Sequence, residues 1–195
     1  MKKPFSVCVY CGSRTGDSPA FVEAAVKVGR WIGAQRGQLV YGGGNNGLMG
    51  VLADATLEAG GRVIGVIPKA LVEREFAKLD CTELHVVDTM HERKRMMAER
   101  ADAFLALPGG IGTFEELFEV WTWRQLGYHD KPIGLLDAAG YFGPLLAFLR
   151  SSVIHGFMSD WQMDLLRVDS DPGVLLRQLS QSSGSRSSVA DLRGI

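Results

Sequence analysis

The architecture of this chain is set by the segment Gln38-Leu39-Val40-Tyr41-Gly42-Gly43-Gly44-Asn45-Asn46-Gly47-Leu48-Met49-Gly50. A short apolar run passes through a cluster of glycines into a stretch of helical length, which is typical of a β-strand, a tight turn and an α-helix. Gly42, Gly44 and Gly47 also satisfy the spacing G-x-G-x-x-G. Units of this kind build parallel sheets that are covered by helices.

The same alternation of short apolar runs and amphipathic stretches continues in both directions from this segment. It predicts strands over residues 5–10, 38–41, 63–67, 85–87, 103–107, 133–136 and 165–168. It predicts helices over residues 19–35, 48–59, 90–101, 113–126 and 144–152, and a last helix from residue 172. We therefore expect an α/β fold of the Rossmann-like, doubly wound type, with a mainly parallel sheet and helices on both of its faces.

Length and composition indicate one domain. The chain has 195 residues, 46% of them hydrophobic, which suits a single core. We expect that domain to span residues 1–180. Six of the nine residues from Ser180 to Ser188 are serine, a composition that buries little apolar area, so residues 181–195 are expected to form a disordered tail.

Charge and cysteine content narrow the function classes. Lys and Arg number 21 against 22 Asp and Glu, so no basic excess favours a nucleic-acid partner. The apolar runs are far shorter than the ~20 residues of a membrane span. The cysteines are Cys8, Cys11 and Cys81, and no second Cys or His pair completes a zinc site with Cys8 and Cys11. We expect a reduced, cytoplasmic protein without a membrane segment or a structural metal.

The glycine loop at residues 42–47 is weak evidence when taken alone. A dinucleotide site needs an acidic residue about 20 positions further on, and the strand 63–67 ends at Pro68 without one. A phosphate loop of the Walker type needs a lysine, which this loop lacks. A further interpretation, which stays open, is a tight turn that lets the next helix pack closely.

A second glycine-rich segment, residues 107–116, follows the strand 103–107. Its glycines would bring backbone N–H groups together at a helix N-terminus, which favours a phosphate. The alternative is a capping box, with Thr113 as the N-cap residue and Glu116 reaching back to its backbone N–H. From the residues alone both interpretations stay open.

A third segment, Met90-His91-Glu92-Arg93-Lys94-Arg95, opens the helix after the strand 85–87. Three cations at a helix start oppose the helix dipole, which indicates an anion nearby, although a solvated charged face is the common alternative. The loops after parallel strands open on one edge of the sheet. Phosphate donors, a guanidinium and a carboxylate would then share one crevice. The charged connection 68–83 is a candidate lid over that edge.

These motifs together resemble a known family, the Lonely Guy type of cytokinin-activating nucleotide phosphoribohydrolases, whose members often carry the label lysine decarboxylase. The matching segments are Cys11-Gly12-Ser13, Tyr41-Gly42-Gly43-Gly44, Gly47-Leu48-Met49-Gly50, Val66-Ile67-Pro68, Met90-His91-x-Arg93-Lys94 and Pro108-Gly109-Gly110-x-Gly112-Thr113-x-x-Glu116. The resemblance implies hydrolysis of the N-glycosidic bond of N6-modified adenosine 5'-monophosphates, and often of AMP, to free base and ribose 5-phosphate. It implies no cofactor.

The resemblance also assigns roles to particular residues. Arg93 and Glu116 match the catalytic arginine and glutamate of the family. The implied substrate contacts are Glu75, Arg93, Lys94, Gly109, Gly110, Ile111, Gly112, Thr113, Phe114, Glu115 and Thr122. The family further implies a homodimer, with the helix that carries Thr122 near the shared interface. The label lysine decarboxylase is set aside, because no segment marks a lysine for a pyridoxal Schiff base.

The chemistry of the reaction agrees with this set of residues. Cleavage of a ribosyl C–N bond passes through a cation-like sugar, which requires a nearby carboxylate, a water and a grip on the phosphate. The main alternative is a non-catalytic nucleotide-binding protein, a sensor or carrier, since similar loops bind phosphate without chemistry. A nicotinamide-dependent oxidoreductase is disfavoured by the missing ribose-binding acid.

Overall fold

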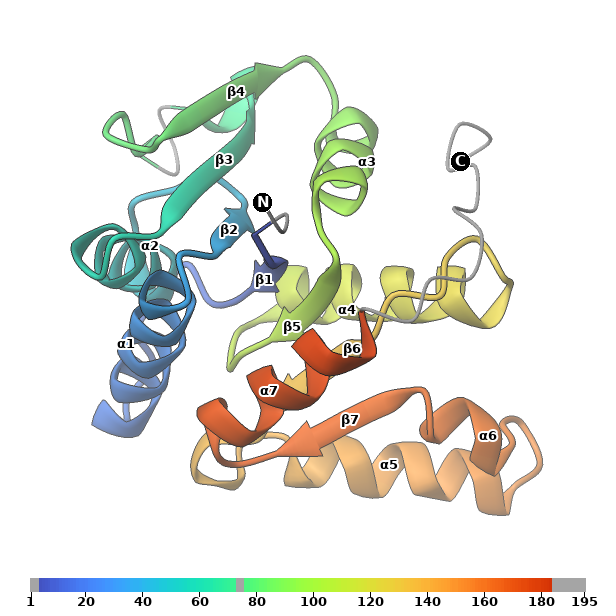
Figure 1. The fold of residues 1–195 in the computed structure, drawn as a ribbon. Coiled ribbons are helices and arrows are strands. Elements are labelled where there is room, and N and C mark those ends of the chain that lie inside the picture. The colour runs from blue at the N-terminus through green and yellow to red at the C-terminus, as the bar shows by residue number, and fades with distance from the viewer. Residues whose placement is uncertain (1–3, 73–75, 184–195) are drawn as a thin grey trace.

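The computed structural model describes residues 4–72 and 76–183, which form a single parallel sheet with helices on both faces (Figure 1). The strands of this part of the chain are β1 (Ser6–Tyr10), β2 (Gln38–Tyr41), β3 (Arg62–Pro68), β4 (Glu83–Val87), β5 (Ala103–Ala106), β6 (Ile133–Leu136) and β7 (Leu166–Asp169). Their order in the sheet is β4-β3-β2-β1-β5-β6-β7, and every pairing is parallel. Strands β2 to β4 therefore extend the sheet on one side of β1, and β5 to β7 extend it on the other side. The strand order reverses between β1 and β5.

The helices divide between the two faces. Their bounds are α1 (Pro19–Ala34), α2 (Gly47–Glu58), α3 (Met90–Arg100), α4 (Ile111–Gln125), α5 (Gly143–Ile154), α6 (Asp160–Met163) and α7 (Pro172–Ser182), with the 3-10 turns η1 (Lys69–Leu71) and η2 (Ala138–Gly140). One apolar cluster joins α1, α2 and α7 to the sheet, and a second joins α3, α4, α5 and α6 to its other face.

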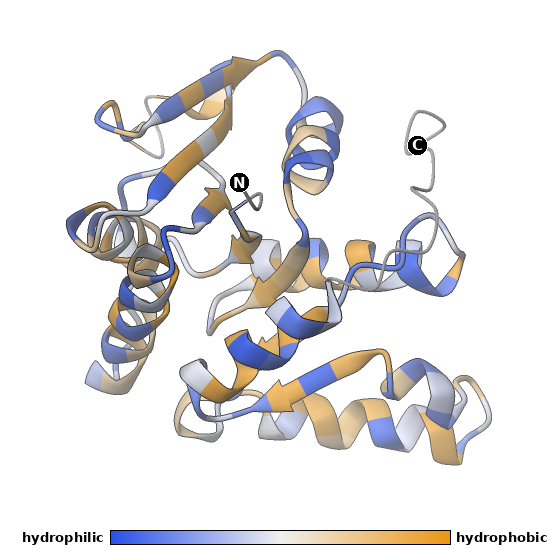
Figure 2. Cartoon of the chain, in the orientation of Figure 1, coloured by the Kyte–Doolittle hydropathy of each residue, from blue (hydrophilic) through white to orange (hydrophobic). Residues whose placement is uncertain are grey.

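Alternation along the strands explains why two cores form. On β1, Cys8 and Tyr10 belong to one cluster, whereas Val7 and Val9 belong to the other, because successive side chains of a strand point to opposite faces. All five residues of β1 are buried. Strands buried on both faces form nearly continuous hydrophobic runs. Figure 2 shows the orange, hydrophobic colour along β5 and a mixture of orange and blue on the surrounding helices.

The predicted fold class is confirmed, and the differences lie in the short elements. Residues 38–41 and 133–136 form strands with the predicted bounds, and most other elements shift by one or two residues. The helix α6 and the turns η1 and η2 were not predicted, because each has only three or four residues and shows no periodicity. Helix α7 extends to Ser182, so its last turn enters the predicted tail, and residues 184–195 lie outside the described part.

Residues 69–72 and 76–82, the described part of the connection between β3 and β4, contain no helix longer than η1, and residues 76–78 are hydrogen-bonded to the glycine loop. Ala77 forms an antiparallel bridge with Gly44, and the N–H of Lys78 donates to the carbonyl of Gly43 at 2.9 Å. The ammonium of Lys78 is buried against Asp54 at 2.6 Å. The predicted lid therefore includes an anchored segment over residues 76–78. None of the helices in residues 4–72 and 76–183 is long and apolar enough to cross a membrane.

Candidate active site

A cavity of about 630 Å³ opens at the point where the strand order reverses, outside the carboxyl ends of β1 and β5. Its lining residues are Cys11, Gly12, Ser13, Arg14, Thr15, Gly16, Phe21, Leu48, Met49, Leu71, Met90, Arg93, Pro108, Gly109, Gly110, Ile111, Gly112, Thr113, Glu115, Glu116 and Tyr141. In open α/β sheets this switch point is where ligands bind, because the loops on its two sides diverge and leave a crevice. The cavity has the size of a small-molecule site.

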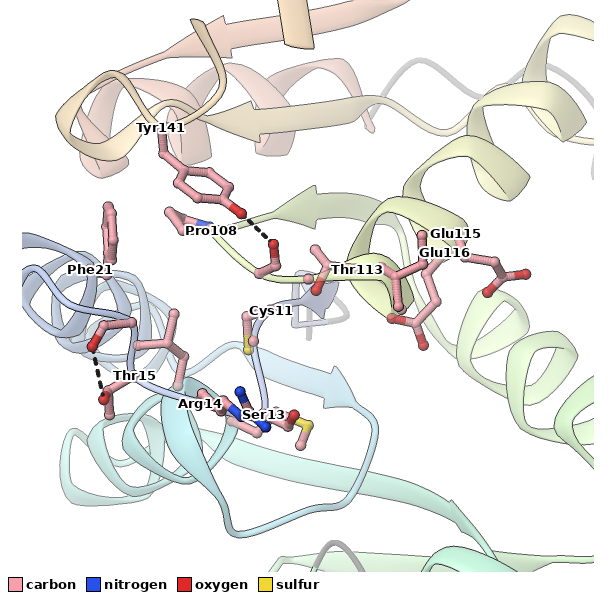
Figure 3. A pocket seen from close by; sticks show the side chains of 18 of the residues that line it. Cys11, Ser13, Arg14, Thr15, Phe21, Pro108, Thr113, Glu115, Glu116 and Tyr141 are labelled. Atoms are coloured by element: carbon pink, nitrogen blue, oxygen red, sulfur yellow. Dashed lines mark hydrogen bonds between the residues drawn. The ribbon is translucent and has the colours of Figure 1, made fainter. Parts of the chain in front are cut away.

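Glu116 lies in this cavity on the second turn of α4. Figure 3 shows its carboxylate directed toward the side of Cys11, whereas the carboxylate of the neighbouring Glu115 points away from it. The two side chains differ in direction because consecutive residues are 100° apart on a helix. The negative charge of Glu116 contributes to raising the pKa of Cys8, Tyr10 and Cys11, after the larger effect of burial. Glu116 therefore sits over the carboxyl end of β1.

Arg93 reaches the same cavity from the first turn of α3 and is almost fully buried. Its Nη2 donates to the carbonyl oxygen of Gly42 at 3.2 Å. The positive charge of Arg93 lowers the pKa of the Cys8 thiol, against the dominant effect of burial. The charges of Arg93 and Glu116 thus both act on Cys8. The start of α3 is a capping box, in which the Thr89 hydroxyl accepts from the N–H of Glu92 and the Glu92 carboxylate accepts from the N–H of Thr89.

The turn before α4 has backbone N–H groups that could bind an anion. Gly110 is the N-cap residue, so the first-turn N–H groups of Ile111, Gly112 and Thr113 have no carbonyl acceptor within the helix. The positive end of the helix dipole adds to their attraction for negative charge. A Cβ placed on Gly110 or Gly112 would meet no atom within 4 Å, so both positions are open.

The capping box predicted as the alternative for this segment is wrong. Helix α4 begins at Ile111, three residues earlier than that interpretation requires, and therefore Thr113 lies inside the first turn. Thr113 is buried, and its hydroxyl packs against Gly109, where a Cβ would lie 2.1 Å from Oγ1. Glu116 is thereby available to face the cavity rather than the helix end.

The glycine loop after β2 has a supporting role. Residues 42–47 are absent from the cavity lining of the described chain, and only Leu48 and Met49 behind them contribute to it. Gly42 is required by a close approach, since a Cβ at this position would lie 2.0 Å from Nη2 of Arg93. The first glycine of the G-x-G-x-x-G pattern therefore allows the guanidinium of Arg93 to lie against the loop. This role agrees with the tight-turn interpretation.

Lys94, Phe114 and Thr122 are predicted contacts that are not among the residues lining the cavity. Lys94 forms ion pairs with Glu115 and Glu119. Phe114 packs against Phe142, with ring centroids 6.4 Å apart. Thr122 is exposed on α4. Glu75 falls outside the described residues.

Sequence reasoning gave no role to several residues that line the cavity. Ser13, Arg14 and Thr15 follow β1, Phe21 opens α1, and Tyr141 follows η2. The strand order could have identified the first group, because the loop after β1 always borders the switch point when β1 lies beside β5. Nothing in the sequence pattern indicates Phe21 or Tyr141.

The cysteines are free thiols rather than nucleophiles. Burial raises the pKa of Cys8 and of Cys11 well above the ordinary value for a thiol, and the charge of Glu116 acts in the same direction. A thiol is reactive only as a thiolate, which these surroundings disfavour. Among the described residues, no group of three or more His, Cys, Asp and Glu side chains is placed to hold a metal ion.

Fold and site together define an α/β protein in which the N-terminus of a helix, a carboxylate and an arginine line one switch-point cavity. Comparison with known proteins identifies the family to which this chain belongs. The profile described as "Possible lysine decarboxylase" matches residues 49–179. A probable cytokinin riboside 5'-monophosphate phosphoribohydrolase of Oryza sativa subsp. japonica is 45% identical over 184 residues, which cover 94% of this chain and 82% of the relative.

A cytokinin riboside 5'-monophosphate phosphoribohydrolase of Arabidopsis thaliana is 46% identical over 175 residues, which cover 90% of this chain and 81% of that protein. The chain belongs to the family of cytokinin riboside 5'-monophosphate phosphoribohydrolases. This confirms the resemblance noted from the motifs.

The solved structures resemble this chain in fold alone. A molybdenum cofactor carrier protein from Chlamydomonas reinhardtii matches with a TM-score of 0.71 at 21% identity, covering 93% of this chain and 98% of that one. A molybdenum cofactor binding protein from Rippkaea orientalis matches with a TM-score of 0.69 at 20% identity, with the same coverage. The architecture is therefore shared by one protein described as a cofactor carrier and one described as a cofactor-binding protein.

Proposed function

We propose that the protein hydrolyses the N-glycosidic bond of N6-modified adenosine 5'-monophosphates to the free base and ribose 5-phosphate. The observation that carries this proposal is that Glu116, Arg93 and the first turn of α4 line the same cavity. A carboxylate beside an anion-binding turn adds nothing to phosphate binding, because the two negative charges repel. It is useful when a positive charge develops on the sugar between them.

Glu116 supplies the charge and the base that the reaction needs. As the bond between C1′ and the purine nitrogen breaks, its electron pair leaves with the base and the ribose becomes cation-like. The carboxylate stabilises this cation and accepts one proton from the attacking water, whose oxygen forms the new bond to C1′. The departing purine takes up one proton. The net reaction consumes one water for each nucleotide cleaved.

Arg93 and the turn 109–113 hold the substrate in position. The N–H groups at the start of α4 suit the 5'-phosphate, and the hydrogen bond from Arg93 to Gly42 fixes the guanidinium at the cavity wall. Lys94 takes part indirectly in this proposal, since it pairs with Glu115 at the edge of the cavity. Glu75 is kept as a further substrate contact on the family resemblance.

The apolar part of the cavity favours an N6-alkylated base. Leu48, Met49, Leu71 and Met90 line it together with Phe21. Burying a prenyl group against such side chains is favourable by roughly 25 cal/mol for each Å² of apolar area removed from water. AMP lacks this group, so AMP nucleosidase activity is part of the proposal as the slower reaction.

Assembly and location complete the proposal. A homodimer in which α4 lies near the interface would give Thr122, which is exposed and lies outside the cavity, access to the partner's site. Leu126, just after α4, is 61% exposed, which suits an interface. Light scattering after gel filtration tests the dimer.

A cytoplasmic location is proposed from the three free cysteines and is tested by cell fractionation.

The deciding experiment is chromatography of the products formed from N6-isopentenyl-AMP and from AMP, each beside its dephosphorylated nucleoside. We expect free base from the monophosphates alone, and a loss of at least about a hundredfold in Glu116→Gln. Glu119→Gln is the matched control, because it changes a carboxylate on the same helix that lies outside the cavity lining. Absence of base from every nucleotide with a folded wild-type protein would refute hydrolysis and favour the carrier alternative.

A further inference from the structure

Tyr141 contacts the anion-binding turn from an unrelated part of the chain. Its hydroxyl donates to the carbonyl oxygen of Gly109 at 2.5 Å (Figure 3). The residue follows η2, in the connection after β6, and it lines the cavity. Because β6 lies next to β5 in the sheet, the turn after β6 reaches the loop that follows β5. A side chain distant in sequence is thus hydrogen-bonded to the backbone that precedes α4.

The turn that carries Tyr141 is firmly held. Asp137 accepts a hydrogen bond from the N–H of Phe142 at 2.7 Å, and its own N–H donates to the carbonyl of Asp169 at 2.9 Å. Phe142 is fully buried. Ala139 has a φ of 52°, a conformation that costs a residue with a side chain some energy and that persists only in a well-braced turn.

Aromatic packing fixes the ring of Tyr141 as well as its backbone. The ring meets Phe21 edge to face, with centroids 5.5 Å apart, and meets Phe142 in the same manner at 4.9 Å. Edge-to-face pairs at these separations are favourable. Little freedom therefore remains for the hydroxyl, which is held at the height of the Gly109 carbonyl.

The hydrogen bond between Tyr141 and the Gly109 carbonyl also orients the neighbouring N–H of Gly110, because both groups belong to one planar peptide. The carbonyl of Gly109 and the N–H of Gly110 belong to one peptide group, and in a trans peptide these two bonds point in opposite directions. Because the Gly109 carbonyl is held toward Tyr141, the N–H of Gly110 points away from Tyr141. Figure 3 shows Cys11 and Glu116 on that other side of the turn. Neither Gly109 nor Gly110 has a side chain to restrict this peptide, so an external tether matters here.

We infer that Tyr141 is a positioning residue for phosphate binding: its hydroxyl holds the Gly109 carbonyl and so orients the Gly110 N–H toward the 5'-phosphate of the substrate. This inference rests on the proposed function, because it takes the turn 109–113 to be the phosphate site. It predicts an effect on phosphorylated ligands alone. A tyrosine that only filled space would affect stability and every ligand alike.

Tyr141→Phe tests the inference, since it removes the hydroxyl and keeps the ring that packs against Phe21 and Phe142. Tyr128→Phe is the matched control, because Tyr128 is exposed to a similar extent, 39% against 37%, and is not among the lining residues. For each protein we would measure KM and kcat with N6-isopentenyl-AMP, the Kd of ribose 5-phosphate by calorimetry, inhibition by adenosine, and Tm.

We expect Tyr141→Phe to raise KM and the Kd of ribose 5-phosphate about fivefold to tenfold, the effect of one hydrogen bond. Inhibition by adenosine and kcat should stay within about twofold of the wild type, and the lost hydrogen bond should lower Tm by only a few degrees. Tyr128→Phe should leave all of these quantities unchanged. A Kd for ribose 5-phosphate equal to that of the wild type overturns the inference, as does an equal loss for adenosine.

The binding measurement separates this inference from the proposed function. If the wild type binds ribose 5-phosphate but releases no base, hydrolysis is refuted, and a weaker Kd in Tyr141→Phe still supports the positioning role. If the wild type releases base and Tyr141→Phe binds ribose 5-phosphate normally, only the positioning role is refuted. If ribose 5-phosphate does not bind to the wild type, the turn 109–113 is no phosphate site and the inference falls.

Discussion

Nη2 of Arg93 lies 3.2 Å from the carbonyl oxygen of Gly42, so the guanidinium on α3 is tied to the backbone that follows β2. The approach is close enough that a methyl group on Gly42 would lie 2.0 Å from the same nitrogen. A guanidinium has a fixed planar fork of donors, and one committed donor therefore sets the direction of the others. The glycine loop thereby acts on the cavity through Arg93.

Gly42→Ala should therefore impair turnover more than stability. The added methyl group displaces the guanidinium, and a misplacement of about 1 Å at a reacting site costs about a hundredfold in rate. We expect kcat/KM to fall to that extent, as measured by release of base from N6-isopentenyl-AMP, while the protein remains folded by circular dichroism.

Gly143→Ala is the control for this substitution. A Cβ at Gly143 meets no atom within 4 Å, and the residue lies outside the cavity lining. It should turn over substrate like the wild type. Equal activity in Gly42→Ala and Gly143→Ala would show that the position of Arg93 does not matter for turnover.

Cys11 should be dispensable for the reaction although it lines the cavity. Burial, together with the charge of Glu116, raises the pKa of its thiol, so the nucleophilic thiolate is disfavoured near neutral pH. We expect Cys11→Ala to keep kcat within about threefold, a change attributable to lost packing. A loss as large as that of Glu116→Gln would mean that the thiol takes part in the chemistry.

The fold could be predicted because its strands are buried on both faces. Residues 103–106 and 133–136 are apolar throughout, and each run is bounded by a turn residue and followed by a helical stretch. Periodicity carries this information locally, without any knowledge of strand order. Short elements such as α6 show no periodicity in the sequence, since four residues do not complete a helical repeat.

The site could be predicted only in part, because strand order and helix rotation are properties of the packed molecule. The helical pattern alone does not give the directions of the Glu115 and Glu116 side chains. The rotation of α4 pairs Glu115 with Lys94 and directs the carboxylate of Glu116 toward the side of Cys11. Tyr141 meets Gly109 only because β6 pairs with β5. Spacing rules do not encode such long-range neighbours.

Lys78 should contribute more to stability than an exposed lysine in a comparable ion pair. Its side chain is 5% exposed and pairs with Asp54 at 2.6 Å and Asp80 at 2.9 Å. Removing the buried ammonium loses hydrogen bonds to charged groups, which are worth about 1.5–3 kcal/mol each when well formed, although both carboxylates face solvent. We expect Lys78→Met to lower the free energy of unfolding by about 1–2 kcal/mol in urea titrations.

Lys69→Met provides the comparison. Lys69 pairs with Asp88 at 2.6 Å, but both side chains are about 70% exposed, and such pairs add little to stability. We expect no measurable change. If the two substitutions proved equally harmless, the segment 76–78 would be held by its backbone pairing with the glycine loop alone.

His129 should make the protein less stable in mild acid. Its ring is buried against Phe104, with Nε2 2.9 Å from the carbonyl of Val120 and Nδ1 accepting from the N–H of Lys131 at 3.2 Å. Burial lowers its pKa to about 4, and the positive charges of Lys131 and Arg124 act in the same direction. An unfolded histidine has a pKa of about 6.5, so between these values the unfolded chain binds more protons than the folded one.

The resulting stabilisation is complete above pH ~6.5 and is lost as the pH falls toward 4. Between pH 7 and pH 5 the loss of stabilisation amounts to about 2 kcal/mol. We expect His129→Gln to flatten the pH dependence of the free energy of unfolding by this amount, whereas His155→Gln, on the exposed end of α5, keeps the slope of the wild type. Urea titrations at pH 5 and at pH 7 measure both. An unchanged slope in His129→Gln would mean that the ring is protonated in the folded protein, with Lys131 and Val120 arranged differently around it.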